Sequence, residues 1–185
     1  FVVTIGIVFA VIGSHKKENN PSVADNQNNK TTAEPTTEEE TTTKVPTVEV
    51  DLMMIGDMLM HEGVVKSGLM DDGTYNFDHL YTSIAKDISS ADIKIVNQET
   101  ILGGSDFAYT GYPTFNSPWA LGDAEVKAGF NIILHATNHT LDKGLKGVEN
   151  CLSFWKTYHP DTTVLGINET EEDYENIYVY EKEGF

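Results

Sequence analysis

The fold is decided by residues 131–144, which read NIILHATNHTLDKG. Residues 131–135 form a short run with an apolar centre, which is typical of a strand in a buried parallel sheet. The residues that follow are polar and include Asn138 and His139. Ligands of open α/β sheets bind beyond the carboxyl ends of the strands. We therefore expect this stretch to supply one strand of a sheet and part of a binding site.

Strand and helix patterns alternate on both sides of this stretch. We expect further strands at residues 48–56, 92–97, 163–167 and 176–185. Apolar stripes at helical spacing indicate helices at residues 77–88 and 145–159. Ser117 and Pro118 provide an N-cap and a first-turn proline for another helix, which closes at Gly129. This order predicts an α/β fold with crossover connections between its strands.

Composition limits the ligands that the chain can handle. Its 185 residues include 29 Asp plus Glu and 12 Lys, with no Arg, and the formal net charge is −17. This charge excludes a nucleic-acid binder, which needs a basic face. The single cysteine, Cys151, excludes an intramolecular disulfide and a multi-cysteine zinc site. Because the chain has no guanidinium group, an anionic ligand would need a metal ion or backbone amides.

Polar side chains follow three of the predicted strands. Asp57 and His61 come after the first strand, and Glu99 comes after the second. Asn138 and His139 follow the third. Oxygen and imidazole ligands of this kind suit Mn, Fe, Zn or Mg. Two divalent ions bridged by a carboxylate would explain how so acidic a chain meets an anion.

Each of these residues also has a purely structural interpretation. Asp57 could form a turn or cap a helix, and Glu99 could be a solvated loop carboxylate. Asn138 could cap the next helix, and His139 could be a hydrogen-bonded structural histidine. His135 directly follows apolar strand residues, so we expect it to pack in the core. The conjunction of polar groups at three strand ends favours a functional site.

The N-terminal part differs from the rest. Residues 1–13, FVVTIGIVFAVIG, are apolar almost throughout but shorter than the about 20 residues that span a bilayer. Because the chain begins with Phe, we expect this run to be the remnant of a signal peptide or of a membrane anchor, and both remain open. Residues 14–47 are rich in Asn, Thr, Glu and Pro, which predicts a disordered linker. Residues 48–185 form the expected domain, which we take to be truncated at its C-terminus.

Several short blocks together resemble a known family. They are Gly56-Asp57-x-x-x-His61, Ala91-Asp92, Asn97-x-Glu99, Tyr112-Pro113-x-Phe115-x-Ser117-Pro118, Gly129-Phe130-Asn131 and Asn138-His139-x-x-Asp142-x-Gly144. In this order and spacing they resemble the CapA family, the capsule and poly-gamma-glutamate biosynthesis proteins of bacteria. The resemblance covers residues 48 to 185, and an N-terminal hydrophobic anchor with a linker is also usual in that family.

The resemblance implies a fold and a site. The CapA family belongs to the calcineurin-like metallophosphoesterases, whose fold is a sandwich of mixed sheets flanked by helices, and we expect this chain to hold its N-terminal part. Asp57 and Asn138 correspond to metal ligands of that superfamily. His139 corresponds to the residue that contacts the phosphate or protonates the leaving group. From its position at a strand end we expect Glu99 to bridge the metals, and we expect Asp142 to orient His139.

The sequence departs from the superfamily pattern at several positions. The superfamily has His two residues after the first Asp, whereas this chain has Leu59 there, and we take His61 as the metal ligand instead. The usual Gly-Asp-x-x-Asp block is replaced by one that starts at Asn97. Thr137 stands where the superfamily usually has Gly.

These observations lead to one functional expectation and two alternatives. We expect a membrane-tethered, extracytoplasmic protein of capsule or poly-gamma-glutamate biosynthesis, with a metal-dependent hydrolase or transferase site that holds two divalent ions (Mn, Fe, Zn or Mg). Its expected partners are an anionic polymer or phosphorylated substrate and membrane-bound capsule or polyglutamate synthesis proteins. One alternative is a non-catalytic assembly or polymer-handling subunit on the same fold. The other is a general phosphoesterase.

Overall fold

The computed structural model describes residues 47–183. The expected signal or anchor remnant at residues 1–13 lies outside the described residues, and so does the expected linker at residues 14–47 apart from Thr47. Within the described part, no helix has both the length and the apolar character needed to span a membrane.

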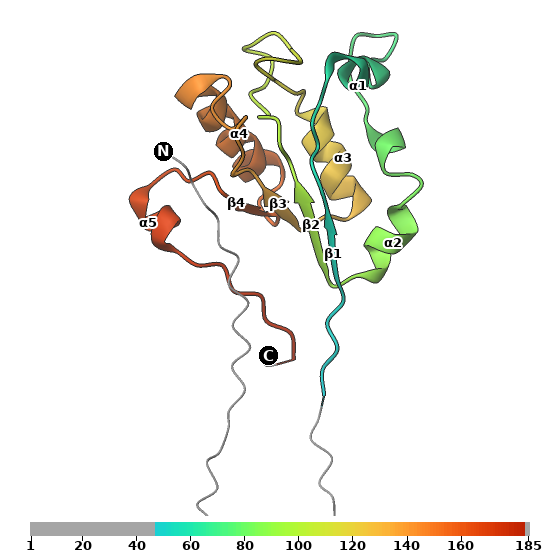
Figure 1. Cartoon of the computed structure of the whole chain (residues 1–185), viewed down its shortest axis with the longest axis vertical. Coiled ribbons are helices and arrows are strands. Elements are labelled where there is room, and N and C mark those ends of the chain that lie inside the picture. Colours follow the sequence, from blue (N-terminus) through green and yellow to red (C-terminus); the bar gives the residue numbers. More distant parts are fainter. Residues whose placement is uncertain (1–46, 184–185) are drawn as a thin grey trace, which may run out of the picture. The chain divides into compact units, whose positions relative to one another are not determined.

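A four-stranded sheet forms the centre of the described part, with all neighbouring strands parallel (Figure 1). Its strands, in spatial order, are β1 (Leu52–Ile55), β2 (Ile93–Asn97), β3 (Ile132–Leu134) and β4 (Thr163–Leu165). Spatial order therefore follows chain order, as expected when each crossover packs on the same side. The predicted α/β class is confirmed, and the parallel sheet with its helices is consistent with part of a metallophosphoesterase-like fold.

Helices connect and follow the strands. They are α1 (Glu62–Ser67), the 3-10 helix η1 (Asp78–Leu80), α2 (Ala85–Ser90), α3 (Ala120–Ala128), α4 (Gly144–Tyr158) and α5 (Glu171–Glu175). The chain leaves α3 at Gly129, whose φ of 108° is left-handed, so the predicted glycine stop is confirmed. Helix α4 also forms where its stripe predicts a helix: Val148, Leu152 and Trp155 pack on the core, whereas Leu145 is 75% exposed.

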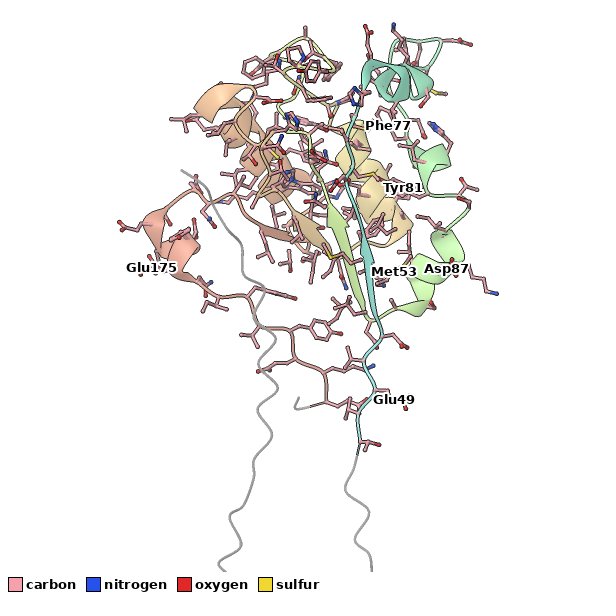
Figure 2. The ribbon with its side chains drawn as sticks, in the orientation of Figure 1. Glu49, Met53, Phe77, Tyr81, Asp87 and Glu175 are labelled. Carbon is pink, nitrogen blue, oxygen red and sulfur yellow. The ribbon has the colours of Figure 1, made fainter. Side chains whose placement is uncertain are left out.

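The core lies on one face of the sheet. Val96 and Ile133 are fully buried on that face, and α3 and α4 contribute Leu121 and Phe154 to the same cluster. Phe77 and Tyr81, on the segment between α1 and α2, complete it (Figure 2).

The opposite face of the sheet is much more open. In-register strand partners point their side chains to the same face. The residues on this side are Leu52, Met54, Ile93, Ile95, Asn97, Ile132, Leu134, Thr163 and Leu165. At the β1 end of this face Leu52 is 46% exposed and Met54 is 50% exposed. Apolar side chains thus face outward from the described part of the chain.

Three local predictions were wrong. The helix expected over residues 77–88 is divided into η1 and α2, with turns at residues 81–84 between them. Ser117 does not cap α3, because its hydroxyl is 2.6 Å from that of Thr100. Residues 176–183 of the expected C-terminal strand form no strand; they follow α5, and Ile177 is 83% exposed.

Candidate functional site

The polar segments that follow β1, β2 and β3 meet at one edge of the sheet. The register pairs Ile55 with Val96 and Asn97 with Leu134, so the three strands end side by side. Backbone bonds extend this alignment past the strands, since the Met58 N–H donates to Asn97 O (2.8 Å). The residues that the sequence places after each strand are therefore neighbours.

His139 lies between two carboxyl groups. Its Nδ1 is 2.8 Å from Asp142 Oδ2, and its Nε2 is 4.0 Å from Glu99 Oε1. The three side chains are only 13–15% exposed, so solvent screens these interactions weakly. The predicted partnership of Asp142 with His139 is present in the structure.

Glu99 also faces Asp57. Asp57 is held by Asn97, whose Nδ2 donates to Asp57 Oδ1 at 2.5 Å. The pKa of Glu99 is raised, first because burial disfavours its charged form and then because the Asp57 carboxylate repels it. His139 and His61, when protonated, act in the opposite direction. Three other predicted site residues, Asp57, His139 and His61, therefore act electrostatically on Glu99.

Thr137 ties the third segment to the second. Its hydroxyl donates to the backbone carbonyl of Glu99 (2.7 Å) and accepts the backbone N–H of His139 (3.1 Å). Glycine, which the superfamily usually has at this position, could make neither bond. The threonine thus fixes the distance between the segments that carry Glu99 and His139.

Phe115 stands between the two histidines. Its ring meets those of His61 and His139 edge to face, with centroids 5.2 and 4.5 Å apart. Its backbone N–H donates to Asp142 Oδ2 at 2.7 Å. Phe115 is 1% exposed, so this contact is part of the packed structure.

The structure brings together most, but not all, of the residues predicted for the site. Those that meet are Asp57, His61, Glu99, His139 and Asp142. Asn138 is exposed, and no hydrogen bond among the described residues joins its side chain to the others. Their assignments as metal ligands and catalytic groups stay predictions.

His135 packs in the core, as predicted. It is 1% exposed and accepts a hydrogen bond from Trp155 Nε1 at 2.9 Å. Burial lowers its pKa to about 3, so it stays neutral.

Sequence reasoning missed the contacts made by Asn97, Thr137 and Phe115. All three stand within or beside the blocks of the family resemblance, which was the available signal. Their partners, however, are set by how the strand ends are joined in space.

A comparison with protein families gives the same affiliation. Residues 51–185 match the family model described as bacterial capsule synthesis protein PGA_cap. The chain belongs to this family. Membership confirms the resemblance to the CapA family and implies a role in capsule synthesis. None of the curated proteins matches the chain.

The PGA_cap family is metallophosphoesterase-like, which suggests divalent metals. Asp57 and Glu99 provide two adjacent carboxyl groups, the oxygen donors that hard divalent ions prefer. In residues 47–183, however, no group of three or more His, Cys, Asp and Glu side chains is arranged to hold a metal ion. The described residues supply suitable donor types without the geometry of a metal site.

Proposed function

We propose that this PGA_cap protein carries out a hydrolysis or group-transfer step of capsule synthesis at Glu99, His139 and Asp142. The observation that carries the proposal is the position of His139, with one ring nitrogen 2.8 Å from Asp142 and the other 4.0 Å from Glu99. A histidine oriented by one carboxylate and facing a second titratable group is the arrangement that general acid–base catalysis uses.

The hydrogen bonds support a definite proton position on His139. Asp142 Oδ2 already accepts the Phe115 N–H, so it acts as an acceptor, and His139 Nδ1 donates to it. A neutral imidazole has a single N–H, so Nε2 is left free to take a proton. Glu99, which Nε2 faces, is partly buried beside Asp57, and its pKa is raised. His139 Nε2 is therefore the proposed proton acceptor of the site.

The proposed substrate is an anionic polymer such as poly-gamma-glutamate, or a phosphorylated molecule. The net charge of −17 repels such a substrate unless cations are present. The proposal therefore includes divalent ions, two in the intact protein (Mn, Fe, Zn or Mg). When bound, they would polarise a phosphoryl or carbonyl oxygen. Asp57, Glu99, Asn138 and His61 are the proposed ligands.

The proposal also includes a location. Residues 1–13 have the apolar composition of an anchor or signal remnant, and residues 14–47 have the polar composition of a linker. We take the domain to act outside the cytoplasm, beside membrane-bound capsule or polyglutamate synthesis proteins.

Capsule formation in living cells tests the proposal. We expect His139→Ala in the full-length protein to abolish capsule production while the protein accumulates and melts as the wild type does, because His139 lies at the edge of the sheet and is not part of the hydrophobic core cluster. His79→Ala is the matched control, since that histidine is exposed and lies on η1, away from the site.

Wild-type capsule levels in His139→Ala cells would reject the catalytic proposal and leave the non-catalytic assembly role. Turnover of a generic aryl phosphate by the purified protein, with capsule unaffected by His139→Ala, would instead identify a general phosphoesterase.

A further inference from the structure

Residues 110–116, in the connection between β2 and α3, form a hairpin beside the site. A bridge between Thr110 and Asn116 closes it, and the Thr110 hydroxyl donates to Thr114 O at 2.6 Å. Asn116 is fully buried; its Oδ1 accepts the Gly103 N–H (2.9 Å) and its Nδ2 donates to Gly104 O (3.0 Å). The base of the hairpin is therefore fixed to a buried backbone segment.

The hairpin contacts both histidine-bearing segments. On one side, Gly111 lies so close to the start of α1 that an added Cβ would be 2.9 Å from the backbone N of Glu62. On the other side, Lys143 Nζ donates to Thr114 O at 3.1 Å. Phe115 closes the space between the segments with its ring and its N–H.

We propose that Phe115 is a positioning residue for the pair formed by His139 and Asp142. Its N–H occupies the same oxygen, Asp142 Oδ2, that accepts from His139 Nδ1, so the carboxylate cannot turn away without breaking two bonds. Its ring lies against the imidazole and blocks rotation of His139 away from Glu99. The proposal rests on the proposed function in taking His139 as the acting group.

This role differs from simple core filling. Phe115 does not belong to the main hydrophobic cluster, and its two aromatic partners are both histidines. A residue that only fills space would affect the melting temperature of the protein, whereas a positioning residue also affects the hydrogen bond between His139 and Asp142. That bond is therefore the quantity to measure.

Proton NMR of the full chain measures it directly. A ring N–H that donates to a carboxylate gives a deshielded, slowly exchanging signal, and we assign it to His139 by its loss in His139→Gln. We expect Phe115→Ala to abolish or broaden this signal while the dispersion of the other amide signals is kept. Gly111→Ala should shift or abolish it as well, because the added methyl group displaces the hairpin from α1.

Tyr112→Ala is the matched control. Tyr112 lies at the hairpin tip and is 79% exposed, so its removal should leave the signal unchanged. An unchanged signal in both Phe115→Ala and Gly111→Ala would overturn the proposal, and Gly111→Ala decides the matter where Phe115→Ala does not fold. If the signal depends on Phe115 but His139→Ala cells make normal capsule, positioning stands and the proposed function fails.

Discussion

Glu125 is a carboxylic acid inside the hydrophobic core. It lies on α3, is fully buried, and neither carboxyl oxygen has a hydrogen-bond partner among the described residues. Tyr81, the neighbour that could stabilise its charged form, donates its hydroxyl to Met58 Sδ (3.0 Å). Burial raises the pKa of Glu125 well above its ordinary value, so the side chain is buried in its protonated form.

The raised pKa predicts the pH dependence of stability. The folded state binds the Glu125 proton more tightly than the unfolded state, so the free energy of unfolding falls as pH rises from the ordinary value of 4.5 towards the folded-state pKa. Glu125→Gln, which stays neutral, should remove this loss. Urea unfolding at about pH 5 and about pH 9 should show the variant gaining on the wild type at the higher pH.

The titratable groups beside Glu125 keep their charge state between about pH 5 and about pH 9, so they do not add to this pH dependence. Burial raises the pKa of Tyr81, and it raises that of Cys151 to about 12, so both stay neutral. Glu149→Gln is the matched control, because Glu149 is an exposed residue of α4. The prediction is wrong if Glu125→Gln and Glu149→Gln show the same change with pH.

Residue positions in the site could be predicted only in part. Asp57, Glu99 and His139 follow from the rule that ligands bind at strand ends, which requires only the positions of the strands. The contacts of Thr137 and Phe115 could not be predicted, because each joins its own segment to one far away in the sequence. Such contacts depend on how loops pack, and no local pattern specifies that.

At the scale of elements, the turns after β3 and β4 are packed against each other. Gly166 directly follows β4 and has a left-handed φ of 93°. A Cβ there would lie 2.4 Å from the backbone N of Ala136, in the turn that leads to the site. The Leu165 carbonyl also accepts the His135 N–H (2.8 Å). Close backbone approach at this point needs a glycine.

Gly166→Ala should therefore destabilise the protein. We expect a loss of roughly 2 kcal/mol or more in the free energy of unfolding, from the left-handed backbone and the displaced turn. Gly63→Ala in α1 is the matched control, because a Cβ there meets nothing within 4 Å. Alanine at that helical position should stabilise by up to about 1 kcal/mol. Equal melting temperatures for the two variants would contradict this explanation.

The elements differ in how well the sequence predicts them. The strands could be predicted from their short apolar runs, although Leu52 and Met54 of β1 are about half exposed. Helix α4 could be predicted from the helical spacing of Val148, Leu152 and Trp155, which pack on the core. The split within residues 77–88 could not, because the apolar spacing continues through the turns at residues 81–84. Residues 176–183 have strand-like composition, but a strand requires a partner, and composition says nothing about one.

At the scale of the whole molecule, charge dominates. A net charge of −17 means that self-repulsion opposes compactness, so added salt should raise the melting temperature by screening it. A divalent ion that binds the folded protein also raises the free energy of unfolding by RT ln(1 + [L]/Kd), which is about 2.7 kcal/mol at a concentration 100 times Kd.

The two effects can be separated. At matched ionic strength, Mn²⁺ or Mg²⁺ should raise the melting temperature of the full chain more than NaCl does, and Asp57→Asn should remove only the extra rise. Asp161→Asn, at an exposed position, controls for the lost charge. An extra rise of the same size in Asp57→Asn as in the wild type would exclude Asp57 as a ligand.

The outward-facing side of the sheet has a consequence for the protein at interfaces. Water wets the side chains of Leu52 and Met54 poorly, and both are about half exposed (46% and 50%). On plastic, or at an air–water boundary, the part formed by residues 47–183 would adsorb through this side. The strands would then lie parallel to the surface. Their carboxyl ends, next to His139, would stay at the edge of the adsorbed molecule, where solutes can reach them.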